Sequence, residues 1–204
     1  MDLKLGDTRL IIDACKKRGL LRNQTAYVLA TAYHETAHSM RPIRELGGEK
    51  YLKSKPYYPF VGMGYVQLTW KHNYERAGKK LGVDFVKNPK LLLQAKYASP
   101  ILVIGSAEGW FTGKCLADYI TLTRSDFTGA RKIINGSDRA RLIADIAIRY
   151  DGLLKQEGYG EATTSKSSVS RGPSPKGPVS SPPRTGWLAA LKAFFIAFVK
   201  GRRA

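Results

Sequence analysis

Residues 62–74 read GMGYVQLTWKHNY, and this stretch shapes our interpretation of the whole chain. Two glycines two positions apart permit a tight turn, and a helical pattern starts at about Trp70 and is predicted to end at Leu81, before Gly82. Between turn and helix lie Gln67 and Thr69, whose amide and hydroxyl groups suit a polar ligand. The segment therefore predicts a loop that leads into a helix and presents polar side chains.

The chain around this segment, over residues 1–159, reads as mostly helical. Asn23 is a predicted cap for a helix that runs to about His38. Gly47, Gly48, Pro56 and Pro59 predict loops or short strands. Further helices are expected at about 90–111, 127–134 and 139–155.

The composition changes near residue 160. Residues 160–186 are rich in Pro, Ser and Gly and have almost no residues for a core, so we expect a disordered, flexible linker there. Residues 187–204, WLAALKAFFIAFVKGRRA, predict a cationic, hydrophobic C-terminal helix. Its apolar run is too short to span a bilayer comfortably, which favours a helix in a membrane interface. The alternative is a helix that docks onto the first domain or onto a partner.

The charge balance indicates an anionic partner. The 34 Lys and Arg outnumber the 16 Asp and Glu, which gives a net charge of +18. Residues 160–204 carry +7 of it, and residues 1–159 carry +11. Nucleic acid, an anionic membrane and the bacterial envelope all fit such a charge.

Two further features concern the cellular compartment. The cysteines, Cys15 and Cys115, are too few for a disulfide framework, and we expect two reduced thiols. The N-terminal sequence shows no secretory signal, so we expect synthesis in the cytoplasm and export by another route.

The segment His34-Glu35-Thr36-Ala37-His38 matches the H-E-x-x-H pattern of zinc peptidases. On a continuous helix, His34 and His38 would share a face and hold one Zn²⁺ while Glu35 serves as the base. A third ligand would have to come from His72, Glu45 or Glu49, because Arg41 and Arg44 occupy the positions of the extended motif.

The same glutamate also suits glycoside hydrolysis. This reaction needs one carboxylic acid to protonate the leaving oxygen and a second carboxylate on the opposite face of the sugar. Glu35 lies late in an apolar helix, where burial would keep it protonated. Glu45 follows ten residues later, in a loop that can face it across a cleft with room for a water molecule, as an inverting enzyme requires.

Three segments in order, HET (34–36), GMGYVQLTWKHNY (62–74) and IINGS (133–137), resemble the signature of family 19 glycoside hydrolases. This family comprises chitinases and related phage endolysins. The resemblance covers about residues 20–155. It implies a mostly α-helical α+β, lysozyme-like catalytic domain (residues 1–159) with two lobes and a central cleft.

The resemblance also implies roles for single residues. Glu35 takes the place of the general acid, Glu45 that of the second carboxylate, and Thr69 that of the hydroxyl that holds the attacking water. Glu49 is a rival for the second carboxylate, and a supporting arginine maps to Arg139 or Arg141. The segment departs from the family in having Met63 where an arginine is usual.

The remaining polar and aromatic residues of these motifs are candidates for sugar binding. Amide groups suit N-acetyl and hydroxyl groups, and aromatic rings suit sugar faces, although rings at this spacing are equally often core residues and Asn135 can simply form a turn. The candidates are Gln67, Tyr65, Asn73, Tyr74 and Asn135, with Trp70 as a further ring.

Taken together, these features predict an endolysin that cuts β-1,4 bonds of bacterial peptidoglycan. The alternatives are a chitinase and a zinc peptidase. We expect a monomer without cofactor, metal or nucleic-acid partner, which acts on the cell wall and contacts an anionic membrane or outer membrane through residues 187–204.

Overall fold

Six α-helices and one small sheet make up residues 1–160, the part of the chain that the computed structural model describes. The helices are α1 (Thr8–Arg18), α2 (Arg22–Glu35), α3 (Gly48–Lys53), α4 (Lys71–Leu81), α5 (Ala95–Glu108) and α6 (Ala140–Gln156). The strands are β1 (Ile43–Arg44) and β2 (Met63–Gly64), and three 3₁₀ helices are η1 (Pro89–Leu93), η2 (Leu116–Asp118) and η3 (Gly129–Ile133). The predicted linker beyond Gly160 and the predicted helix 187–204 lie outside the described residues.

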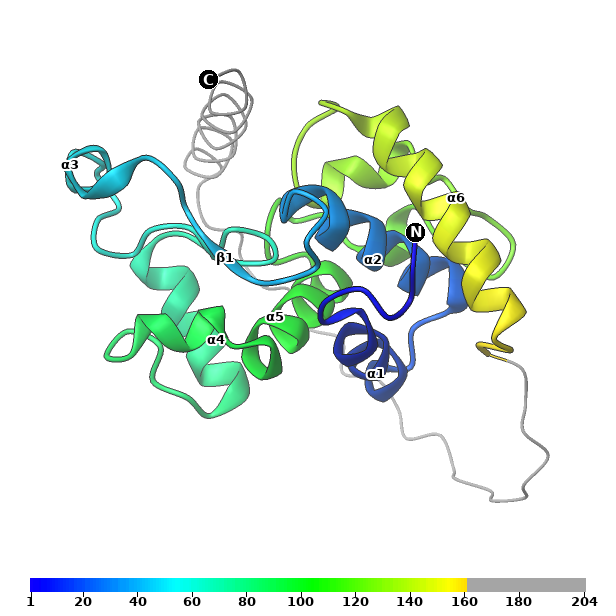
Figure 1. Cartoon of the computed structure of the whole chain (residues 1–204), viewed down its shortest axis with the longest axis horizontal. Coiled ribbons are helices and arrows are strands. Elements are labelled where there is room, and N and C mark those ends of the chain that lie inside the picture. The colour runs from blue at the N-terminus through cyan, green and yellow to red at the C-terminus, as the bar shows by residue number, and fades with distance from the viewer. Residues whose placement is uncertain (161–204) are drawn as a thin grey trace.

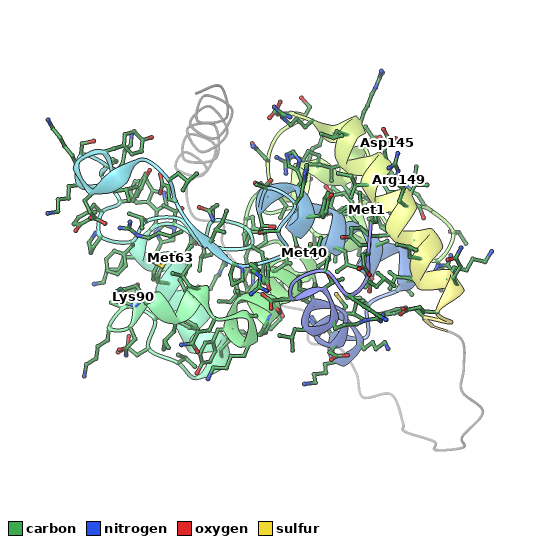
Figure 2. The ribbon with its side chains drawn as sticks, in the orientation of Figure 1. Met1, Met40, Met63, Lys90, Asp145 and Arg149 are labelled. Atoms are coloured by element: carbon green, nitrogen blue, oxygen red, sulfur yellow. The ribbon has the colours of Figure 1, made fainter. Side chains whose placement is uncertain are left out.

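This content confirms the expected mostly helical fold with a small β component. Figure 1 shows the elements in two groups, with the sheet, α3 and α4 on one side and α1, α2 and α6 on the other. Helix α5 lies between the groups (Figure 1). Met63 lies in the first group, and the buried Met40 lies near the middle of the molecule (Figure 2). The arrangement agrees with two lobes, and the central cleft stays a prediction.

Helix α2 forms the centre of the second group. Its middle consists of small and apolar residues without a polar face, and Ala26, Leu29 and Ala30 have no exposed surface. A helix of this kind is stable only when neighbours cover its whole circumference. Helix α6 packs along it (Figure 1), and an ion pair between Arg22 and Asp151 (2.9 Å) joins the two helices.

The predicted ends of α2 are corrected by the structure. The helix begins at Arg22, so Asn23 lies within its first turn rather than at the cap position. The Asn23 Oδ1 accepts from the Gln24 amide (2.9 Å), and its Nδ2 donates to the Thr121 carbonyl and to Ser125 Oγ, each at 2.8 Å. The helix ends at Glu35, because Ala37 and His38 adopt positive φ angles of 50° and 71°. Asn23 therefore makes tertiary contacts from inside the helix instead of capping it, and the helix stops before His38.

Other predicted helices are confirmed with changes. Helix α4 ends where Gly82 turns left-handed with φ of 67°, as the sequence indicates. The run predicted over 90–111 is divided by the extended Gln94 into η1 and α5. The run predicted over 127–134 is the 3₁₀ helix η3, and α1 and α3 were not expected.

The two-residue strands position the loop after α2. Ile43 pairs with Gly64 and Arg44 with Met63 in an antiparallel ladder. The ladder continues into the next residue, because the Glu45 amide donates to the Gly62 carbonyl (2.7 Å). The sheet therefore holds Glu45 beside the glycine-rich segment that was predicted to carry the site.

Two smaller findings complete the fold. Cys15 and Cys115 are both free thiols, as expected, and burial raises the pKa of Cys15 to about 12. Among the helices of residues 1–160, none is both long enough and apolar enough for a membrane crossing.

Candidate active site

Glu35 lies at the last position of α2 and has no exposed surface. Its Oε1 accepts a hydrogen bond from Nη1 of Arg131 at 2.7 Å, and this ion pair is buried on both sides. Its Oε2 is buried without a hydrogen-bond partner in the structure. One oxygen of Glu35 is thus fixed, and the other remains available for a proton.

Arg131 was not predicted, although the resemblance called for an arginine in this region. The Glu35 pair uses neither Arg139 nor Arg141, whose side chains are exposed on the surface at the start of α6. Arg131 is instead held in η3, and its Nε donates to the Asp138 carbonyl (3.0 Å). The sequence feature that could have indicated Arg131 is its position in an apolar stretch, four residues before Asn135.

The surroundings of Glu35 favour its protonated form. Burial raises the pKa of Glu35 above its ordinary value, against the opposing effect of the Arg131 guanidinium. The loss of hydration destabilises the Glu35 carboxylate more than the neighbouring Arg131 guanidinium stabilises it. This is the ionisation behaviour that a general acid needs.

Glu45 is also buried, and both of its carboxylate oxygens accept hydrogen bonds. The Tyr57 hydroxyl donates to Oε1 at 2.6 Å, and the Gly62 amide donates to Oε2 at 2.9 Å. Two donors suit an ionised carboxylate. Glu35 and Glu45 therefore lie in separate hydrogen-bond networks, the first suited to a proton donor and the second to an anion.

Glu49, the rival second carboxylate, has a different setting. It lies in the first turn of α3, its side chain is 58% exposed, and Arg44 contacts it at 2.6 Å. A surface ion pair of this kind neither orients nor desolvates a carboxylate strongly. The geometry favours Glu45.

Gln67 and Thr69 are both buried and both hold the backbone around β2. The Gln67 Nε2 donates to the carbonyls of Ile43 (3.0 Å) and Gly64 (3.2 Å), while its Oε1 is buried without a partner. The Thr69 hydroxyl donates to the Gln67 carbonyl at 2.7 Å. The hydroxyl hydrogen of Thr69 is therefore used by the backbone, although its oxygen can still accept a hydrogen bond from water, as its expected role requires.

Tyr65 and Tyr74 have no exposed surface. The Tyr65 hydroxyl donates to Oδ2 of Asp7 (3.0 Å), and the Tyr74 hydroxyl donates to the Val61 carbonyl. The structure thus places both rings in the core rather than on a surface open to a sugar. Trp70 is only partly buried, and its ring packs edge-on against Tyr57 with centroids 5.5 Å apart.

The two candidate asparagines make local contacts. The Asn73 Nδ2 donates to the Thr69 carbonyl (2.7 Å), which ties the first turn of α4 to the loop before it. The Asn135 Oδ1 accepts from the Gly136 amide (2.9 Å), so this residue forms the turn that was the alternative to sugar binding. A role of either residue in sugar binding stays a prediction.

The zinc interpretation does not fit the geometry. Because α2 ends at Glu35, His34 and His38 do not share a helical face, and the His38 ring stacks on Tyr33 with centroids 4.4 Å apart. Glu35 pairs with Arg131 instead of facing two imidazoles. Within residues 1–160, no three His, Cys, Asp or Glu residues are grouped so that they could hold a metal ion.

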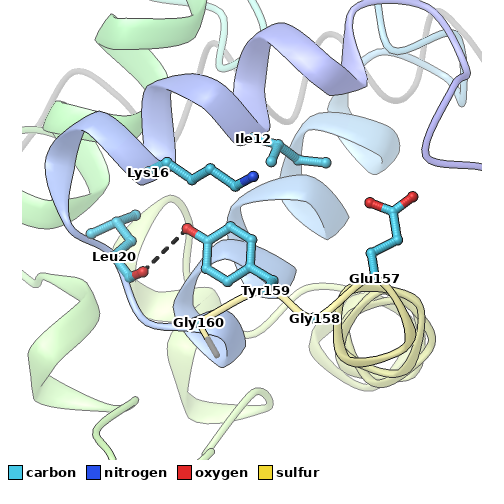
Figure 3. A pocket seen from close by; sticks show the side chains of 7 residues that line it. All are labelled: Ile12, Lys16, Leu20, Glu157, Gly158, Tyr159 and Gly160. Carbon is cyan, nitrogen blue, oxygen red and sulfur yellow. Dashed lines mark hydrogen bonds between the residues drawn. The ribbon is translucent and has the colours of Figure 1, made fainter. Parts of the chain in front are cut away.

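A surface hollow of about 380 Å³ lies elsewhere, between α1 and the end of α6. Lys16, Glu157 and Tyr159 line it, and the Tyr159 hydroxyl donates to the Leu20 carbonyl at 3.2 Å (Figure 3). The Glu157 carboxylate is already paired with Arg9. None of the predicted site residues contributes to this hollow.

Comparison with known proteins places the motifs in context. An endochitinase from Theobroma cacao is 42% identical over 55 residues, which cover 24% of this chain and 17% of that protein. An endochitinase from Arabidopsis thaliana is 28% identical over 131 residues, which cover 61% of this chain and 43% of that protein. The chain is chitinase-like in sequence. It spans less than half the length of these relatives.

The chain was also compared with protein-family models and with solved structures. No protein-family model matches the chitinase-like chain. Chitinase C from Streptomyces griseus aligns in three dimensions with a TM-score of 0.46 and 20% identity, over 66% of this chain and 59% of that one.

Proposed function

We propose that the protein is a glycoside hydrolase that cuts β-1,4 bonds between N-acetylated amino sugars, with Glu35 as its general acid. The observation that carries this proposal is the environment of Glu35. A carboxyl group with raised pKa, one oxygen without a hydrogen-bond partner and a buried arginine on the other oxygen is suited to hold a proton and release it to a substrate. The similarity to endochitinases supports the same reaction.

The proposed reaction follows from the two networks. Glu35 donates its proton to the oxygen of the departing sugar, and the bond from this oxygen to the anomeric carbon breaks. A water molecule attacks that carbon from the opposite face, and the Glu45 carboxylate accepts its proton. Arg131, 2.7 Å away, stabilises the carboxylate that forms on Glu35. Because water attacks directly, the product has inverted stereochemistry.

Access to the acid requires movement. Glu35 has no exposed surface and Glu45 is only 5% exposed. A glycan therefore reaches Glu35 only when the segments that cover it separate, and the proposed enzyme closes over its substrate and excludes water.

For the substrate, we propose bacterial peptidoglycan, and hence an endolysin. The net charge of +18 favours this acidic polymer over neutral chitin. Chitin is the second candidate, and the specific observation in its favour is that both relatives are endochitinases. Measuring new reducing ends from purified peptidoglycan and from chitin oligomers, with mass analysis of the terminal sugar, distinguishes the two substrates.

The decisive variant is Glu35→Gln, which keeps the shape of the side chain but removes the transferable proton. We expect hydrolysis of either glycan to fall by at least about 100-fold, because general acid catalysis contributes a factor of this order. Glu75→Gln is the matched control, since Glu75 is an exposed residue of α4 that pairs with Lys71 at 3.6 Å. Retained hydrolysis in Glu35→Gln, with a normal unfolding transition, would contradict the proposal.

We further propose that the protein acts as a monomer on the cell wall after synthesis in a bacterial cytoplasm. Residues 187–204 then bind an anionic membrane. The support is their sequence, an apolar run that starts at Trp187 and is followed by Lys200, Arg202 and Arg203.

A further inference from the structure

Residues 46–56 form an excursion from the candidate active site, which we call the α3 loop. The loop leaves the sheet after Glu45 and returns at Tyr57, and the hydrogen bond between these two side chains (2.6 Å) closes its base. Figure 1 shows α3 at the far end of the molecule, beyond the ribbon of β1. The loop thus projects outward from the candidate second carboxylate.

The α3 loop is anchored by its own side chains. Leu52 has no exposed surface, so it fixes the inner side of α3 to the core. The Tyr51 ring lies against Gly47, where an added Cβ would come within 2.3 Å of the ring. The Lys55 ammonium lies 3.8 Å from the centre of the same ring. These contacts give the loop a defined outer face.

The outer face of the α3 loop is cationic. Lys50 and Lys53 are exposed, and neither takes part in the ion pairs found within residues 1–160. The exposed acid of the loop, Glu49, is matched by Arg44. The two lysines therefore present positive charge that is not engaged in an ion pair with any carboxylate of the described chain.

We propose that the α3 loop binds the carboxylate groups of peptide stems on the glycan substrate. This inference rests on the proposed function and deepens it, because it assigns a surface that selects an acidic glycan over a neutral one. From Glu45 to Gly48 the chain spans at most about 11 Å, so a glycan held at Glu45 has its substituents within reach of α3. Lysine ammonium groups pair with such carboxylates, whereas N-acetylglucosamine polymers offer none.

The test uses the full-length double variant Lys50→Gln/Lys53→Gln. The matched control is Arg149→Gln/Lys155→Gln, which removes the same charge from exposed positions of α6. Helix α6 lies on the opposite side of the molecule from α3 (Figure 1). Each pair is also placed in the Glu35→Gln background, so that binding to insoluble peptidoglycan is measured without hydrolysis. Hydrolysis of peptidoglycan and of a chitin hexamer is measured in the active background at low and high salt.

We expect the α3 variant to bind peptidoglycan about threefold to tenfold more weakly at low salt, the range that two exposed ion pairs supply. Its hydrolysis of the neutral hexamer should equal that of the unchanged protein, and the difference on peptidoglycan should shrink at high salt. Unchanged peptidoglycan binding, or equal losses in the α6 control, would overturn the inference.

A loss of binding to anionic vesicles with no loss on peptidoglycan would also overturn it, since the loop would then be a membrane contact. Failure of the proposed function looks different. In that case the unchanged protein releases reducing ends from neither glycan, while the binding comparison still decides whether the α3 loop recognises carboxylates.

Discussion

The imidazole of His34, the residue before the candidate acid, is buried. Burial lowers the pKa of His34 from 6.5 to about 3, and electrostatic interactions with Arg131, Arg139 and His38 act in the same direction. The folded protein therefore keeps His34 neutral, whereas the unfolded chain protonates it below about pH 6.5.

This difference predicts a pH dependence of stability. Between pH 6.5 and 3 the unfolded state binds the additional proton, so the stability contributed by neutral His34 is present above pH 6.5 and is lost as the pH falls toward 3. We expect His34→Gln to flatten this decline by up to about 1.4 kcal/mol per pH unit, the value for one proton. Urea unfolding at a series of pH values measures it.

The control for this prediction is His72→Gln, because His72 is exposed on α4. Glu35 has the opposite effect on the pH dependence, because its pKa is raised above the ordinary value of 4.5 in the folded protein. The stability that the protonated Glu35 contributes is therefore lost as the pH increases above 4.5. Parallel stability curves for the unchanged protein and His34→Gln would show that His34 is not held neutral.

At the scale of the elements, packing decides what a helical glycine does. In α5, a Cβ at Gly105 would come within 2.3 Å of the Phe111 ring, so the missing side chain is what lets that ring pack against the helix. In α6, a Cβ at Gly152 would meet nothing within 4 Å. The same residue type is therefore required in one helix and dispensable in the other.

The same substitution should thus have opposite effects in the two helices. We expect Gly105→Ala to destabilise the protein by about 1–3 kcal/mol through overpacking. Gly152→Ala should stabilise it by about 0.5–1 kcal/mol, because alanine has the higher helix propensity and leaves less freedom in the unfolded chain. Thermal and urea unfolding of both variants test this, and a stabilised Gly105→Ala would show that Phe111 moves away at little cost.

At the scale of the whole molecule, the residues of the proposed chemistry all lie within the described part of the chain. Glu35 comes from α2, Glu45 follows β1, and Arg131 comes from η3, and all three are buried with the core of residues 1–160. The proposed membrane contact belongs to residues 187–204. Hydrolysis and membrane binding should therefore be separable.

A chain that ends at Gly160 tests this separation. We expect it to hydrolyse purified peptidoglycan at the rate of the full chain, because it keeps the whole described core. Leakage of anionic liposomes and killing of intact Gram-negative cells should be lost with residues 187–204. Equal leakage and equal killing by both chains would contradict the membrane role.

Much of the candidate site followed from motifs that are local in the sequence. The end of α4 at Gly82 was predictable because a left-handed cap depends on one residue and its neighbours. Arg131 was not, because it is separated from Glu35 by 96 positions, and no local pattern specifies such a contact. The burial of Tyr65 and Tyr74 was not predictable either, because aromatic residues at the same spacing occur both in cores and on binding faces.

The sequence by itself determined the helical class, the approximate position of most helices and the carboxylates suited to glycoside hydrolysis, because periodicity, glycine positions and residue chemistry are local properties. The tertiary structure decided that Glu35 pairs with Arg131, that Glu45 rather than Glu49 is held by two donors, and that α2 stops before His38. Burial and the contacts between distant segments set these features, and both arise only when the whole chain packs.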